Sequence, residues 1–360
     1  MKKTSLNIEH KKINAKMLPF AGYEMPITYG KISDEYNAVR LNCGMFDVSH
    51  MGQIEIKGKE SSDFLQKITI NNILKIKDLG AQYSAICYKN GNLLDDIIIF
   101  KFTNSSFILI VNASNLEKVK NHLGEYSKDF DVIINYLNCD FSLIALQGPE
   151  SRQILNNISD EKIDIKFYNL KKLKLLNEEI IISRTGYTGE LGYEIMGKHA
   201  QIQKVWQYFL DNKIQPCGLA VRDVLRTEMK YCLYGNDIND SINPLEAGLS
   251  WITDLNNEDF IGKSSLVDIQ RDGLKRHLVG FKMIDKAIPR KDYLIFTENK
   301  QIGFVTSGVH SPTLDKGIGI GYINNGYNKI GTQILIKIRS KYMLAEIVKT
   351  PFLNQTSIHT

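Results

Sequence analysis

The sequence predicts an α+β protein of two or three domains that ends in a small β-barrel or sandwich. Its 360 residues exceed what one compact core usually holds. Up to about residue 275, strand-like and helix-like patterns mix without the regular alternation of a doubly wound sheet. Beyond that point, short strand-like runs alternate with Gly-rich turns, which is typical of a small all-β domain.

In the first part, a turn is expected at 21–26 and a helix from Ser33 to Leu41, because Ser33 and Asp34 suit a helix N-terminus. Clean alternation of apolar and polar residues predicts a strand over 53–58. Further helices are expected at 60–70, 114–126, 150–157, 198–212 and 218–230. Further strands are expected at 82–88, 94–102, 106–112, 130–137, 142–149 and 180–184. The strands of the last part are expected at 277–283, 293–296, 302–307, 317–323, 332–338 and 344–348.

Composition narrows the class of protein. The hydrophobic content of 43% and the charged content of 24% are ordinary for a globular protein. No apolar run approaches the ~20 residues that span a bilayer, and the N-terminus lacks signal-peptide and transit-peptide patterns, so we expect a cytoplasmic location and no membrane partner. The net charge of +5 is spread along the chain, which argues against nucleic acid and would suit an anionic small molecule or an acidic protein. Five scattered cysteines without a C-x-x-C pair indicate neither disulfides nor a zinc site.

The stretch 88–100 reads as a strand, a Gly-containing turn and a very apolar strand that begins with Asp95 and Asp96. Neighbouring strand residues point to opposite faces, so one Asp is expected to cap the turn or face solvent while the other points inward. An inward carboxylate beside an Ile run is costly unless it has a partner, as a catalytic acid has. From the pair alone, the turn-capping interpretation is favoured by roughly three to one.

Two further stretches are candidates for a binding site. The loop 184–194 places three Gly and two Thr among Arg184, Tyr187 and Glu194, and it either holds a flat heterocycle or forms a hairpin with solvent-facing polar groups. In the helix at 218–229, Arg222 and Arg226 share a face, where they form surface ion pairs or orient a ligand carboxylate or carbonyl. His50 has no second ligand at a suitable spacing, so no metal site is expected.

Several motifs, taken in order, resemble the T-protein (aminomethyltransferase) family of the glycine cleavage system. They run from near the N-terminus almost to the end of the chain, and it is the ordered set that is specific. The motifs are Ala-Gly-Tyr-Glu-Met-Pro at 21–26, Gly-Met-Phe-Asp-Val-Ser-His-Met-Gly at 44–52, Asn-Gly-Asn-Leu-Leu-Asp-Asp at 90–96, Gln-Gly-Pro at 147–149, Arg-Thr-Gly-Tyr-Thr-Gly-Glu at 184–190, Leu-Tyr-Gly-Asn-Asp at 233–237, Asn-Pro-Leu-Glu at 243–246 and Ser-Gly-Val-His-Ser-Pro at 307–312.

The resemblance implies a three-domain cloverleaf around a central channel, with a C-terminal β-barrel domain. Domain 1 would be discontinuous, covering 1–51 and 138–274 and binding folate. An inserted domain 2 would cover 52–137 and carry Asp96, and the barrel would cover 275–360. The implied reaction transfers the one-carbon unit of the S-aminomethyldihydrolipoyl arm of H-protein to tetrahydrofolate. Ammonia is released, and 5,10-methylenetetrahydrofolate forms.

The resemblance also assigns site residues. The catalytic carboxylate falls on Asp96, which leaves Asp95 at the turn. The acid that grips the pterin falls on Glu194 and its accompanying arginine on Arg222. The remaining folate-lining positions are Tyr83, Tyr187, Asn112, Met51 and Tyr168. The implied partners are lipoylated H-protein and folate, with no metal.

Two alternatives stay open at this point. Another folate-dependent superfamily member, such as a methyl-transferring demethylase, would share the fold. The Asp95–Asp96 pair and the intact Asp-Val-Ser-His-Met-Gly run favour the aminomethyltransferase. A non-catalytic folate-binding scaffold is a rival of another class. Such scaffolds lack the acidic pair and carry a Lys-Gly-Cys motif, where this chain reads Lys230-Tyr231-Cys232.

Overall fold

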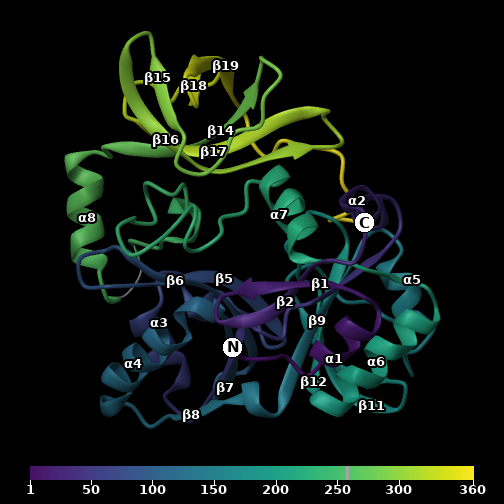
Figure 1. The fold of residues 1–360 in the computed structure, drawn as a ribbon. Helices are drawn as coiled ribbons and strands as arrows, with labels where there is room; N and C mark the ends of the chain where they lie inside the picture. The colour runs from purple at the N-terminus through teal and green to yellow at the C-terminus, as the bar shows by residue number, and fades with distance from the viewer. Residues whose placement is uncertain (257–258) are drawn as a thin grey trace.

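The computed structural model describes residues 1–256 and 259–360 and confirms the α+β class. Its strands form a six-stranded sheet, a five-stranded sheet, a closed six-stranded barrel and a two-stranded hairpin. Figure 1 shows the barrel above the two sheets, with helix α7 (Leu219–Glu228) between them. Within the described ranges, no helix is both long and apolar enough to cross a membrane.

The six-stranded sheet has the order β10-β11-β12-β9-β3-β13. One of its faces packs on helix α6 through Val205, Trp206 and Phe209, the inward side predicted from their helical spacing. The strands of this sheet are β3 (Gly44–Asp47), β9 (Phe141–Gln147), β10 (Leu170–Leu175), β11 (Glu178–Ser183), β12 (Gly192–Lys198) and β13 (Gln215–Pro216). The helices in this part are α1 (Asn7–Lys12), α2 (Ile32–Leu41), α5 (Ser151–Asn156), α6 (His199–Asp211) and α7.

The five-stranded sheet has the order β5-β6-β7-β4-β8. Strand β6 lies between two cores because its alternate residues face opposite sides. Ile97 and Ile99 pack with the helices of this sheet, whereas Phe100 packs against Phe46 of the six-stranded sheet. The elements of this part are β4 (Gly52–Lys57), α3 (Ser61–Ile68), β5 (Gly80–Cys87), β6 (Leu93–Thr103), β7 (Ser106–Val111), α4 (Leu116–Tyr126) and β8 (Ile133–Tyr136).

The barrel is closed by antiparallel pairing of six strands and surrounds a core that includes Phe281, Val305 and Ile336. Each strand overlaps a range expected from the sequence, so the predicted C-terminal β-barrel is confirmed. The strands are β14 (Arg276–Met283), β15 (Leu294–Thr297), β16 (Lys300–Ser311), β17 (Lys316–Asn324), β18 (Gln333–Ile338) and β19 (Lys341–Val348).

Several elements escaped the sequence analysis. The expected turn at 21–26 is largely strand, because β1 (Lys16–Phe20) and β2 (Tyr23–Thr28) form a hairpin that turns at Ala21-Gly22. Strands β10, β12 and β13 and helices α1 and α8 (Lys263–Asp272) were also not expected. Most of β1 is exposed, and α8 buries one residue, Leu266, so their sequences show little of the apolar periodicity that reveals an element. The division into domains over 1–51 with 138–274, 52–137 and 275–360 stays a prediction.

Candidate functional site

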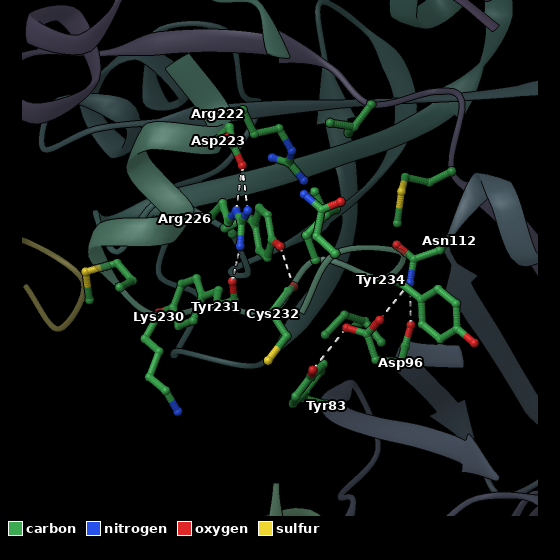
Figure 2. Close-up of a pocket in the computed structure, with 18 of the residues that line it drawn as sticks. Tyr83, Asp96, Asn112, Arg222, Asp223, Arg226, Lys230, Tyr231, Cys232 and Tyr234 are labelled. Atoms are coloured by element: carbon green, nitrogen blue, oxygen red, sulfur yellow. Dashed lines mark hydrogen bonds and ion pairs between the residues drawn. The ribbon is translucent and has the colours of Figure 1, made fainter. Parts of the chain in front are cut away.

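A cavity of about 1300 Å³ lies where the two sheets, α7 and the barrel meet. All eight residues assigned from the resemblance line it, although they come from distant parts of the sequence. They are Met51 after β3, Tyr83 on β5, Asp96 on β6, Asn112 after β7, Tyr168 before β10, Tyr187 before β12, Glu194 on β12 and Arg222 on α7. Figure 2 shows part of this lining.

Asp96 is held from both sides of its carboxylate. The hydroxyl of Tyr83 donates to Oδ2 at 3.0 Å, and Nδ2 of Asn112 donates to Oδ1 at 2.8 Å, as the dashed lines in Figure 2 show. Burial raises the pKa of Asp96 to about 6, while the bonds from Tyr83 and Asn112 pull it back down. A carboxyl group with this pKa is largely ionised at neutral pH and is close to the range in which it exchanges protons.

The expectation that Asp95 caps the turn or faces solvent is wrong. Asp95 is fully buried inside β6, and the turn is instead capped by Asn90, whose side-chain oxygen accepts from the backbone N–H of Asn92. Asp95 accepts from the backbone N–H and Nδ2 of Asn112 and from Nδ2 of Asn115. Burial, followed by the charge of Asp96, raises the pKa of Asp95 well above its ordinary value. Both carboxyl groups of the pair therefore have a raised pKa and share one partner, Asn112.

A second acidic group, Glu194, lies in the same cavity. Its carboxylate accepts a short hydrogen bond from Thr185, and burial raises its pKa, opposed by that bond and by the charge of Arg222. The guanidinium of Arg222 lies 4.7 Å from the ring centroid of Tyr187. Its Nη1 atom is buried without a hydrogen-bond partner among the described residues. A buried, unpaired donor beside a buried carboxylate suits a ligand that presents an acceptor and donors together.

Aromatic rings form two stacked pairs on the cavity wall. Tyr187 stacks on Tyr231 at 5.7 Å, and its hydroxyl donates to the carbonyl of Cys232. Tyr83 stacks on Trp251 at 5.9 Å, although Trp251 remains 72% exposed. Sequence reasoning missed Tyr231 and Trp251. Tyr231 stands in the stretch compared with the Lys-Gly-Cys motif, and Trp251 is one of only two Trp in the chain. Both residues are therefore noticeable in the sequence, but the sequence alone does not indicate that they line a cavity.

The loop 184–194 does not present its polar groups to solvent, so the alternative of a solvent-facing hairpin is wrong. Thr185, Thr188 and Glu190 are buried, and Glu190 pairs with Arg40 at 2.8 Å. Gly189 has φ +82°, and a Cβ there would lie 2.5 Å from the sulfur of Met229. The tight turn therefore needs glycine at this position, and it keeps the loop close to the end of α7.

Helix α7 is fixed to the barrel by Arg226, for which the alternative of a surface ion pair is wrong. Its side chain is 1% exposed and pairs with Asp237 at 2.5 Å, with Asp223 at 2.7 Å and with Ser307 of the barrel at 2.6 Å. Because the guanidinium is buried and bonds to several partners at once, these contacts fix its geometry more firmly than an exposed ion pair would. They set the position of Arg222, one turn earlier on the same helix.

Comparison with known proteins agrees with this architecture. Residues 6–257 match the GCVT N-terminal domain, and residues 276–354 match the glycine cleavage T-protein C-terminal barrel domain. The aminomethyltransferase of Halothermothrix orenii is 42% identical over 98% of this chain and 100% of its own length, and that of Thermosipho melanesiensis is 43% identical over 98% and 97%. A crystal structure of the glycine cleavage system aminomethyltransferase T from Bartonella henselae superposes with a TM-score of 0.94 at 29% identity, covering 99% of both chains.

These matches show that the protein is an enzyme of the T-protein fold, with both the N-terminal domain and the C-terminal barrel domain. The chain belongs to the glycine cleavage T-protein family, and it is an aminomethyltransferase of the glycine cleavage system.

Proposed function

We propose that this aminomethyltransferase binds tetrahydrofolate in the 1300 Å³ cavity and passes to it the one-carbon unit carried on the lipoyl arm of H-protein. Ammonia leaves, and 5,10-methylenetetrahydrofolate forms. The observation that carries the proposal is the pairing, in one cavity, of a desolvated carboxylate, Asp96, with a separate acceptor–donor set, Glu194 and Arg222. Asp96 suits the chemistry, and the pair formed by Glu194 and Arg222 suits recognition of a pterin.

The residues present fit a pterin ring. Glu194 accepts from an amino group and a neighbouring ring N–H, which is the donor pattern of the pterin edge. Arg222 offers to a ring carbonyl its Nη1, which has no partner within the described ranges, and the ring of Tyr187 lies beside that guanidinium. Tyr168 and Met51 provide further wall for the flat ligand. The carbonyl of Met51 is held by Nδ2 of Asn138 at 2.7 Å, which fixes this part of the wall.

Asp96 is proposed as the catalytic residue. Loss of ammonia from the S-aminomethyl group builds positive charge on the one-carbon unit, and a carboxylate already held in place stabilises that charge. At ~4 Å and an effective dielectric of ~20, the attraction is roughly 4 kcal/mol. Tetrahydrofolate, when bound, supplies the two amines that take up the one-carbon unit. Asp96, with its pKa near 6, also suits accepting a proton from such an amine.

The proposed protein partner is lipoylated H-protein, and the proposed location is the cytoplasm. The formal net charge of +5 suits an acidic partner, since opposite net charges speed encounter. No part of the proposal requires a metal, because Asp96 supplies the charge that faces the cationic one-carbon unit.

Reconstitution tests the proposal. The purified protein is mixed with aminomethylated H-protein and tetrahydrofolate, and ammonia and methylenetetrahydrofolate are measured. Equal amounts of both products are expected. When tetrahydrofolate or the lipoyl group is left out, neither product is expected, apart from a slow background release of ammonia. Transfer of a methyl group from a sulfonium donor, without these products, would instead support the demethylase alternative.

A further inference from the structure

We propose that Asp95 is a positioning residue that orients the amide of Asn112 so that Asn112 holds Asp96 for the reaction. This inference rests on the proposed function of Asp96 and adds a residue that neither the resemblance nor the comparisons assign. Five hydrogen bonds carry it, and they join Asp95 and Asp96 on β6 to the turn after β7 that holds Asn112 and Asn115.

The first contacts join Asp95 to Asn112. Oδ2 of Asp95 accepts from the backbone N–H of Asn112 at 3.0 Å, and Oδ1 accepts from Nδ2 of the same residue at 2.8 Å. One carboxylate therefore grips both the backbone and the side chain of Asn112, which leaves the amide little freedom to rotate.

Asn115 supports Asp95 from the other side. Its Nδ2 donates to Oδ1 of Asp95 at 2.6 Å, and both residues are buried. Asn112 and Asn115 begin and end a single turn, because the backbone N–H of Asn115 donates to the carbonyl of Asn112 at 2.9 Å. The turn after β7 thus presents the amide groups of Asn112 and Asn115 to the buried carboxylate of Asp95. These bonds hold the carboxylate of Asp95 and the amide of Asn112 in place together.

The side-chain amide of Asn112 also contacts Asp96. Nδ2 of Asn112 also lies 2.8 Å from Oδ1 of Asp96 and 3.0 Å from its backbone carbonyl. Every group that this nitrogen meets is an acceptor, so the amide is oriented with its nitrogen toward the two aspartates. Figure 2 shows the nitrogen pointing toward Asp96 and the amide oxygen pointing away from it. Asn112 also lines the cavity.

An amide in place of Asp95 would reverse this arrangement. The backbone N–H of Asn112 cannot turn, so the oxygen of an Asn at position 95 must stay opposite it. The NH₂ group of that Asn then faces Nδ2 of Asn112, where two donors meet and one amide must flip. A flipped Asn112 directs its oxygen at the carboxylate of Asp96, which loses a hydrogen bond and gains repulsion.

The change can be read in the titration of Asp96. Titratable groups that face the pair are Tyr83 on β5, Tyr88 after β5, Tyr187, Cys232, Tyr234 and Asp237. All of them remain in an Asp95→Asn variant, which changes two things: the negative charge of Asp95 is lost, and the contact from Asn112 is altered. The lost charge lowers the pKa of Asp96 whether or not Asn112 is present, because the two carboxyl groups repel each other. The contact from Asn112 lowers the pKa of Asp96, so its loss raises that pKa, and it does so only where Asn112 is present.

The test is a double-mutant cycle of Asp95→Asn, Asn112→Ala and the double variant. Turnover of aminomethylated H-protein and tetrahydrofolate is measured against pH. Asp95→Asn is expected to lower kcat about 10- to 100-fold and to keep folate affinity within about 3-fold. It is also expected to shift the midpoint of the pH profile further upward, or less far downward, than the same change does in the Asn112→Ala background. In the Asn112→Ala background, the same change is expected to cost less than about 3-fold, because residues that act through one another do not add. Full multiplication of the two effects on kcat, or the same shift of the midpoint in both backgrounds, overturns the proposal.

Two additions keep the test decisive. If Asp95→Asn does not fold, Asn115→Ala removes one anchor of Asp95 and is expected to give a smaller loss of kcat in the same direction. A loss of thermal stability alone, with kcat and midpoint unchanged, overturns the proposal. Asp47→Asn is the matched control, because Asp47 is equally buried but bonds to His10 and Thr4. It is expected to lower Tm and leave the midpoint unchanged.

A readout without catalysis separates this inference from the proposed function. The carboxyl carbon of Asp96 is titrated by ¹³C NMR in the folate-free protein, with Asp96→Asn used for assignment. A change of the Asp96 pKa by Asp95→Asn that is more positive in the wild-type background than in the Asn112→Ala background supports the orientation, even if the wild-type protein fails in reconstitution. Active wild-type protein with equal changes in both backgrounds overturns the orientation and leaves the proposed function in place.

Discussion

The hydroxyl of Tyr83 lies 3.0 Å from Oδ2 of Asp96 and donates a hydrogen bond to it. Because this bond lowers the pKa of Asp96, it favours the ionised carboxylate at neutral pH, the form that stabilises a cationic one-carbon unit. The ring of Tyr83 at the same time stacks on Trp251 at the cavity wall.

Tyr83→Phe is therefore expected to lower kcat about 10- to 150-fold, the cost of one hydrogen bond to a charged group. The rising limb of the pH–kcat/KM profile, which reports the ligand-free enzyme and is expected near pH 6 in the wild type, is expected to move to higher pH. Tyr88→Phe is a matched control, since the hydroxyl of Tyr88 bonds to Asp240 at 3.3 Å instead. Equal losses in both variants would mean that the Tyr83 bond has no special role.

Removal of Glu194 tests the pterin site. Glu194→Ala is expected to weaken tetrahydrofolate binding about 30- to 100-fold, because a buried charged acceptor is lost. Thr185→Val should weaken it less, about 3- to 10-fold, since Thr185 holds Glu194 without being assigned a ligand contact. Calorimetry gives both affinities. Unchanged affinity in Glu194→Ala would move the pterin to another part of the cavity.

The two tryptophans offer an optical probe of the cavity. Trp206 is fully buried in the core, whereas Trp251 is 72% exposed and lines the cavity against Tyr83. Binding of folate is expected to change the intrinsic fluorescence of the wild-type protein. The change is expected to disappear in Trp251→Phe and to persist in Trp206→Phe. Persistence of the full change in Trp251→Phe would place the ligand away from this wall.

The burial of His122 predicts part of the loss of folding stability at acidic pH. It is 7% exposed, its Nε2 has no partner among the residues described, and burial lowers its pKa to about 4. The unfolded chain therefore takes up a proton below about pH 6.5 while the folded chain does not, so stability falls as the pH falls from about 6.5 to about 4.

His122→Phe removes this penalty. Between about pH 7 and about pH 5, the variant is expected to lose about 2 kcal/mol less unfolding free energy than the wild type. Urea unfolding at the two pH values measures the difference. An identical pH dependence in both proteins would show that His122 titrates normally in the folded state.

The sequence predicted most of the regular elements but not the surroundings of its key residues. Periodicity located the six barrel strands and α6, because a continuous core lies behind each of them. The turn-capping interpretation of Asp95 failed for a physical reason. Its partners Asn112 and Asn115 follow another strand, and local sequence does not reveal which amides reach a buried carboxylate.

The candidate site was predictable only as an ordered set of motifs. Spacing alone left the 184–194 loop and the Arg222–Arg226 face open between structural and ligand-binding interpretations. The resemblance identified eight residues that the structure brings together, and it passed over Trp251 and Tyr231. Both reach the wall by stacking on another aromatic residue, which is a tertiary contact without a sequence period.

Single-turnover kinetics of Asp96→Asn test the central claim most directly. The variant keeps the size of the side chain and loses its negative charge. With saturating tetrahydrofolate and aminomethylated H-protein, methylenetetrahydrofolate formation is expected to slow by at least about 100-fold, while folate affinity stays within about 3-fold of the wild type. Near-normal product formation with normal folate binding would contradict the assignment of the chemistry to Asp96.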